Sequence, residues 1–343
     1  MKRTQLYLIV ILVLQLALAG FTLWPRSTVS SSASTPLFAK LNASDVVALT
    51  VYDKPDSSLK LARQGGGWVL PAADNYPADS AKVDGFLTKV AGLKTNRLVT
   101  KTEASQARLQ VAANQYQHRV DMQTASGTSQ TLYVGSSSGA QATNVRAGDR
   151  PEVYLADTLT DADATAQAGT WINPTYLAIT TTDTLNFTLK NANGEFSFTK
   201  DASGKWAMAG QAASETLNQD NVTTVTNVLT SLAMTAPLGK TAKPEYGLDH
   251  PLAVMTLTTK TGNKTYTLTV GALQKGADGA NSYVVKSSES PYYVQVSEYT
   301  VKTLVDQKRD GFLQLPPTPT PGPAGAAAAG TPAPFQTIPA PKQ

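Results

Sequence analysis

"GGGWVLP", residues 65–71, places a tryptophan directly after a glycine turn and at the start of a short apolar strand. "SGKWAMA", residues 203–209, repeats this arrangement in the second half of the chain. Trp68 and Trp206 are two of only four tryptophans in the sequence. A tryptophan between a strand and an amphipathic helix is placed to bury a large area against both. We therefore predict that Trp68 and Trp206 are core residues.

The segments around each tryptophan match in order and residue class. Apolar residues alternate with polar ones in a hairpin before each tryptophan, and they recur at helical spacing after it. The hairpins fall at 47–61 and 185–198, and the helical runs at 83–93 and 222–232. In each half, two further alternating strands follow and end at Gly135 or Gly271, and the next short strand carries Arg146 or Lys286. So many matched elements in register indicate an internal duplication.

The apolar N-terminus predicts a membrane anchor. Lys2 and Arg3 precede residues 6–24, in which Gln15 is the only strongly polar residue. About 20 apolar residues are enough to cross a bilayer, and basic residues favour a cytoplasmic N-terminus. The alternative is a signal peptide cleaved near "ALA" (17–19). We favour the anchor because cleavage there would leave the apolar "GFTLWP" on the mature protein. Both alternatives place the body of the protein outside the cytoplasm.

These patterns together predict an α+β fold. We expect two tandem homologous β-hairpin–helix–β-meander repeats behind an N-terminal transmembrane helix. The expected segments are an anchor at 1–25, a Ser/Thr-rich linker at 26–43, repeats at 44–172 and 181–312, and a disordered Pro/Ala/Thr-rich tail at 316–343.

Composition excludes several classes of function. The chain has no cysteine, so disulfides and thiolate metal sites are excluded. The net charge of +4 comes from scattered residues, which does not suit a nucleic-acid partner. "TDADA" (160–164) lacks the glycine and glutamate of a calcium loop, and the glycine-rich stretches at 135–140 and 271–280 lack the Gly-Lys-Ser/Thr ending of a phosphate loop. We therefore expect no cofactor, no metal and no catalytic residue.

"YGLDHP" (246–251) is the most distinctive short motif. We expect Tyr246, Gly247, Leu248 and Pro251 to have structural roles in the repeat core, with Gly247 supplying a backbone angle that other residues resist. Asp249 and His250 could pair as base and orienter of a hydrolase. A turn that positions the next strand is the simpler interpretation, and we favour it.

Arg146 and Lys286 are cations at matching positions of the two repeats. Equivalent basic residues could bind an anionic group or a partner. The alternative is that both are solvated charges that protect an edge strand.

The order hairpin, Gly-x-Trp, helix, "YGLDHP" and "LxVG" resembles the bacterial domain of unknown function 4340 family. The resemblance covers nearly all of residues 44–312, although the first repeat has "LQVAANQYQHRV" (109–120) where the motif is expected. It implies a membrane-anchored protein in the context of gliding-motility-type ABC transport systems, and it offers no catalytic residues to carry over.

We therefore expect a non-catalytic, single-pass membrane protein with an extracytoplasmic body that acts as an accessory subunit of an ABC-type complex. The alternatives are an envelope-binding or structural surface protein and, with less support, an envelope hydrolase.

Overall fold

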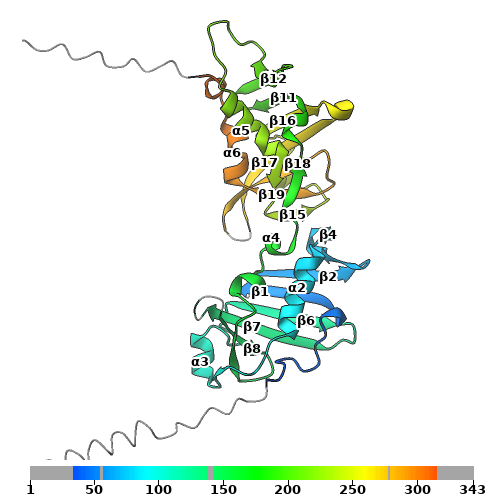
Figure 1. The fold of residues 1–343 in the computed structure, drawn as a ribbon, viewed down its shortest axis with the longest axis vertical. Coiled ribbons are helices and arrows are strands. Elements are labelled where there is room, and N and C mark those ends of the chain that lie inside the picture. The colour runs from blue at the N-terminus through cyan, green and yellow to red at the C-terminus, as the bar shows by residue number, and fades with distance from the viewer. Residues whose placement is uncertain (1–33, 55–56, 138, 140–141, 277–278, 315–343) are drawn as a thin grey trace, which may run out of the picture.

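Antiparallel strands dominate the protein in the computed structural model, which describes residues 34–54, 57–137, 139, 142–276 and 279–314 (Figure 1). The strands form sheets of nine, eight and two strands, whereas the longest helices of the described residues have 12 residues each. The predicted fold class was therefore wrong: strands dominate the described residues, and none of their helices could be the predicted transmembrane helix. Each large sheet carries one amphipathic helix of only 12 residues, so helices contribute much less than strands to each half of the described chain.

No helix of the described residues is long and apolar enough to cross a membrane. The predicted anchor (1–25) and tail (316–343) lie outside the described residues. The described part of the predicted linker, 34–43, belongs to the fold, because Leu37, Phe38 and Leu41 are buried in the hydrophobic core.

The nine-stranded sheet is built from residues 46–156 in the order β4-β3-β2-β1-β6-β7-β8-β9-β5. Its strands are β1 (Val46–Lys54), β2 (Ser57–Gln64), β3 (Gly67–Leu70), β4 (Tyr76–Pro77), β5 (Leu98–Thr100), β6 (His118–Thr124), β7 (Ser129–Ser137), β8 (Thr143–Ala147) and β9 (Val153–Ala156). The hairpin β1–β2 aligns Leu49 with Leu61 and Val51 with Leu59, which places these side chains on one face.

The eight-stranded sheet has the order β13-β12-β11-β16-β17-β18-β19-β15. Its strands are β11 (Thr184–Asn191), β12 (Gly194–Lys200), β13 (Trp206–Met208), β15 (Ala236–Gly239), β16 (Ala253–Thr259), β17 (Thr265–Lys275), β18 (Asn281–Ser287) and β19 (Tyr293–Ser297). If β4 is set aside, the two large sheets have the same strand order: β3 corresponds to β13, β2 to β12, and so on to β5 and β15. β4 is the additional strand of the first sheet. The small sheet pairs β10 (Thr175–Ala178) with β14 (Ser231–Ala233).

One 12-residue helix packs on each large sheet. α2 (Ser80–Ala91) is capped at its N-terminus by Asp79, whose carboxylate accepts hydrogen bonds from two main-chain N–H groups. α5 (Gln219–Thr230) is capped by Asn218, whose side chain accepts one such bond. The other helices of the described residues are α3 (Glu103–Arg108), α4 (Ala168–Trp171) and α6 (Glu298–Asp306). The 3₁₀ turns are η1 (Ala43–Asp45), η2 (Pro71–Ala73), η3 (Asp161–Ala164), η4 (Thr181–Asp183), η5 (Pro244–Tyr246), η6 (Thr261–Asn263) and η7 (Arg309–Phe312).

The two tryptophans of the repeated phrase lie in the core. Trp68 is 1% exposed, and its indole N–H donates to the Asp84 carboxylate on α2 over 2.9 Å. Trp206 is 6% exposed and meets the ring of Phe187 edge-on at 5.1 Å. The Trp68 indole therefore joins β3 to α2, and the Trp206 indole joins β13, an edge strand, to the buried ring of Phe187.

A junction of specific contacts connects the two large sheets. The Tyr76 and Tyr292 rings meet edge-to-face at 4.7 Å, and the Lys240 main-chain N–H donates to the Asp74 carboxylate over 2.5 Å. Tyr176, on the connecting strand β10, donates its hydroxyl to the Tyr292 carbonyl over 2.8 Å. Glycine is favoured at position 239 because its φ is +100°, and a Cβ there would also lie 2.6 Å from an oxygen of the Asp74 side chain.

Candidate functional site

The "YGLDHP" segment is seated against a glycine of β17. A Cβ at Gly271 would lie 2.1 Å from the Tyr246 carbonyl oxygen, so only glycine allows this approach. Gly247 has a φ of +65°, in the left-handed region that favours glycine. Tyr246 is buried, Leu248 is half-buried and Pro251 is exposed, so the motif leaves the core as the chain passes from Tyr246 to Pro251.

The first sheet has the same arrangement built from different residues. A Cβ at Gly135 would lie 2.1 Å from the Leu109 carbonyl oxygen, and Gln110 has a φ of +57°. Gln110 thus adopts the backbone conformation that Gly247 adopts in the second sheet. Residues 109–111 therefore occupy the place of residues 246–248 although the letters of the motif are absent.

A pocket of about 520 Å³, which we call the motif pocket, lies beside the exposed half of the motif. It is lined by Lys190, Asn191, Ala192, Asp249, His250, Pro251, Leu252, Val254 and Val305. Leu252 is 40% exposed, which makes it one of few large apolar side chains of the described residues to face solvent. Lys190 belongs to β11 and Val305 to α6, so the pocket depends on three segments that are distant in sequence.

The chemistry of the motif pocket suits binding of an amphipathic segment. Leu252, Val254 and Val305 supply apolar surface, while Lys190, Asp249 and His250 supply charge of both signs. None of those three polar side chains hydrogen-bonds or ion-pairs with another described residue. Asp249 and His250 also make no hydrogen bond to each other, so the structure does not hold them as an orienter and base.

A family model matches residues 68–251, which is more than half of the chain. The matched segment begins at Trp68 and ends at Pro251, so it contains both the first tryptophan and the whole motif. The chain belongs to the domain of unknown function 4340 (DUF4340) family. No curated protein and no solved structure matches it.

In this DUF4340 protein, Arg146 and Lys286 both bind main-chain carbonyls. Arg146 is 5% exposed, lies over the Tyr133 ring at 4.4 Å, and donates through Nε to the Val111 carbonyl over 2.7 Å. A second guanidinium nitrogen donates to the carbonyls of Ala147, Gly148 and Arg150. Burial lowers the pKa of this guanidinium.

Lys286 repeats the contact in the second sheet. Its ammonium donates to the carbonyls of Ser287 and Ser290 over 2.8 and 2.5 Å, and burial lowers its pKa. Each cation therefore holds the turn that follows its own strand. This geometry favours loop stabilisation over anion binding for both residues.

A buried histidine contact of the DUF4340 fold was not visible in the sequence. The Nδ1 atom of His118 lies 2.7 Å from a carboxylate oxygen of Asp53, and the same oxygen accepts the Ala166 N–H over 2.7 Å. His118 is 7% exposed, so its ring is held inside the fold. The contact joins β1, β6 and the segment after η3, and only the fold brings these together.

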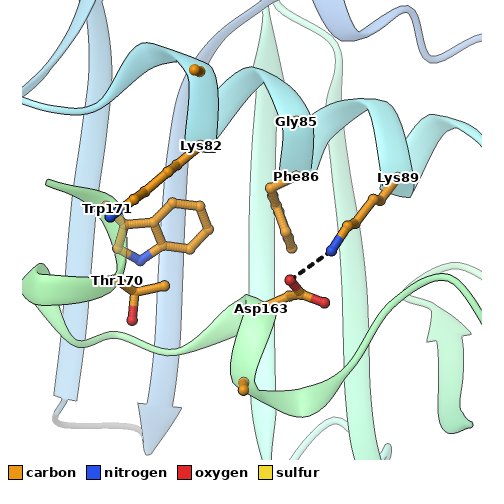
Figure 2. A pocket seen from close by; sticks show the side chains of 9 residues that line it. Lys82, Gly85, Phe86, Lys89, Asp163, Thr170 and Trp171 are labelled. Carbon is orange, nitrogen blue, oxygen red and sulfur yellow. Dashed lines mark hydrogen bonds and ion pairs between the residues drawn. The ribbon is translucent and has the colours of Figure 1, made fainter. Parts of the chain in front are cut away.

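A second pocket, of about 340 Å³, lies along α2 (Figure 2). Lys89 and Asp163 form an ion pair of 2.7 Å across it, and the Lys82 ammonium donates to the Ile172 carbonyl over 2.8 Å. Phe86 and Trp171 meet edge-to-face at 5.2 Å behind these residues. Because its charged groups are already paired, this pocket is a packing seam between α2 and the segment 163–172. The motif pocket is the better candidate for a ligand.

Proposed function

We propose that this DUF4340 protein is a non-catalytic interaction protein whose body lies outside the cytoplasm. Its apolar N-terminal stretch, residues 6–24, holds it at the cell membrane with the N-terminus cytoplasmic. It acts as an accessory subunit of an ABC-type transport or gliding-motility-like complex. The motif pocket carries the proposal, because apolar surface meets three ionisable groups that pair with no other described residue, beside the "YGLDHP" segment.

We also propose that the two large sheets are tandem copies of one ancestral unit. The shared connectivity, the paired seats at Gly135 and Gly271, and the paired contacts of Arg146 and Lys286 support this. The copies have diverged at the motif, since "LQV" (109–111) replaces "YGL" (246–248). We assign partner binding to the second copy, which carries the motif pocket.

One observation favours the alternative of an envelope-binding or structural surface protein. Hydroxyl side chains form a row across four strands of the second sheet, from Ser197 through Thr188 and Thr256 to Thr267. All four are half-buried, as expected for a sheet face without a covering layer. Such a face could hydrogen-bond a hydroxyl-rich polymer. An envelope hydrolase has less support because Asp249 and His250 are not hydrogen-bonded to each other.

Partner capture tests the proposal. The full-length protein is crosslinked mildly in membranes, solubilised gently and purified, and its partners are identified by mass spectrometry. We expect enrichment of an ABC-type membrane subunit that Leu252→Glu abolishes. Leu273→Glu is the matched control, because Leu273 is 44% exposed on the same sheet but lies outside the pocket. Recovery of wall components alone, or equal capture by both variants, would overturn the proposal.

A further inference from the structure

The edge strand β5 exposes two consecutive apolar side chains. Leu98 is 52% and Val99 is 46% exposed, and β5 pairs only with β9 at one end of the first sheet. The other exposed large apolar residues of the described chain, Leu252, Leu273 and Tyr299, all belong to the second half. An apolar edge strand invites association, and proteins usually cover or charge such edges.

The described chain enters the fold beside this edge. The Thr95 N–H donates to the Thr35 carbonyl over 2.9 Å, and Pro36 forms an isolated bridge with Lys94. Thr35 follows the apolar stretch 6–24 by 11 residues. Even at full extension, that length cannot carry Thr35 more than ~40 Å from the end of the stretch. The β5 edge is therefore the part of the fold that is tied closest to the apolar stretch.

Basic residues flank the exposed pair. Lys94, Arg97 and Lys101 are all exposed on the run around β5. Arg97 lies 4.0 Å from Asp157, and Lys101 lies 3.3 Å from Glu152, while Lys94 has no acidic partner among the described residues. Exposed ion pairs of this kind are weak, so anionic head groups can compete for these cations.

We propose that the β5 edge rests on the membrane surface. Leu98 and Val99 enter the interfacial layer, and Lys94, Arg97 and Lys101 contact anionic lipid head groups. This inference rests on the proposed membrane location. It directs the second sheet, with the motif pocket, away from the bilayer, since the two large sheets lie end to end (Figure 1).

A cysteine-free chain allows a direct test, because one introduced cysteine takes all of a thiol-reactive label. Val99→Cys carries an environment-sensitive fluorophore, and the full-length protein is reconstituted into phosphatidylglycerol-containing vesicles with brominated lipid. We expect blue-shifted emission and quenching by the brominated lipid. Leu273→Cys is the matched control, similarly exposed but in the second sheet, and its probe should remain water-like. Adding Lys94→Glu and Arg97→Glu, or using neutral vesicles, should reduce quenching at position 99.

The outcomes separate this inference from the proposed function. A water-like probe at position 99 in protein that floats with the vesicles overturns the inference alone. Protein that does not float overturns the membrane location and the inference with it. A blue shift without lipid quenching means that a polypeptide covers the edge, which also overturns the inference. Equal quenching at positions 99 and 273 contradicts the proposed orientation.

Discussion

Two glycines determine where the motif segments can sit. At Gly135 and Gly271 the nearest atom to an added Cβ is a main-chain carbonyl oxygen, which cannot swing aside as a flexible side chain could. Gly85, on α2, has no atom within 4 Å of the same point. The cost of a methyl group therefore differs sharply between glycines that look alike in the sequence.

We predict that Gly271→Ala and Gly135→Ala each destabilise the protein by about 3 kcal/mol or more, the upper end of the range for overpacked sites. Gly85→Ala should instead stabilise it by up to ~1 kcal/mol, because alanine favours the helix. Chemical denaturation of the detergent-solubilised protein measures the free energies of unfolding. Similar decreases in the free energy of unfolding for all three variants would contradict the importance of the close carbonyl contacts at Gly135 and Gly271.

Gln110 and Gly247 both have a left-handed φ, and substituting each by the other's residue type should change the stability of the protein in opposite directions. Gln110→Gly should stabilise the protein by about 1 kcal/mol, because it relieves a conformation that side chains disfavour. Gly247→Gln should destabilise it by more than that, since its Cβ would also lie 3.0 Å from Ala272. Denaturation midpoints of the two variants check the prediction. A loss of stability for Gln110→Gly would show that the glutamine side chain has a role of its own.

At the scale of elements, Arg146 and Lys286 each stabilise the turn that follows their own strand by donating hydrogen bonds to its main-chain carbonyls. Arg146→Met keeps an apolar stem but removes donors from the Val111 and Arg150 carbonyls, so we expect a loss of ~3 kcal/mol. Lys286→Met should cost ~1 kcal/mol, because Lys286 is only half-buried and donates to two carbonyls. Unfolding free energies of the two variants test this ranking. The reverse order would contradict it.

The turn before α5 is tied to η7 by a bidentate ion pair. Arg309 donates to both Glu215 carboxylate oxygens, and this lowers the pKa of Glu215 to about 2. The folded-state pKa lies below the unfolded value, so the stabilisation is complete above pH 4.5 and is lost as the pH falls through about 2. We predict that Glu215→Gln flattens the decline of stability between pH 5 and 2. An unchanged acid slope in this variant would contradict the assignment.

Local elements were easier to predict from the sequence than their arrangement. The helical stripes at 83–93 and 222–232 and the alternation at 47–61 correspond to α2, α5 and the hairpin β1–β2 in the structure, because these signals arise from near neighbours. The motif pocket is lined both by Val305 of α6 and by the segment after Asp249, which are distant in sequence. The two residues of the His118–Asp53 contact are 65 positions apart. Neither carries a local signal. The fold class was wrong because the short strands β5, β14 and β15 have little alternation to reveal them.

For the whole molecule, the junction fixes how one large sheet stands on the other. We predict that Tyr292→Ala, which removes the contact with Tyr76, broadens the distance distribution between the sheets. Spin labels at Lys60→Cys and Thr199→Cys, read by double electron–electron resonance, measure this distribution. Tyr299→Ala is the control, because Tyr299 is 91% exposed on α6. An equally narrow distribution for Tyr292→Ala would show that the Asp74–Lys240 contact and the connecting strand β10 hold the sheets without the tyrosine pair.

The described chain enters at the free end of the first sheet and leaves at the far end of the second (Figure 1). Tension applied between these two ends therefore loads both sheets in series through the junction. Each sheet resists with long ladders of main-chain hydrogen bonds, whereas the junction resists with a tyrosine pair, one carboxylate contact and the short strand β10. Under pulling, the molecule would lengthen by parting at this joint while both sheets stay folded.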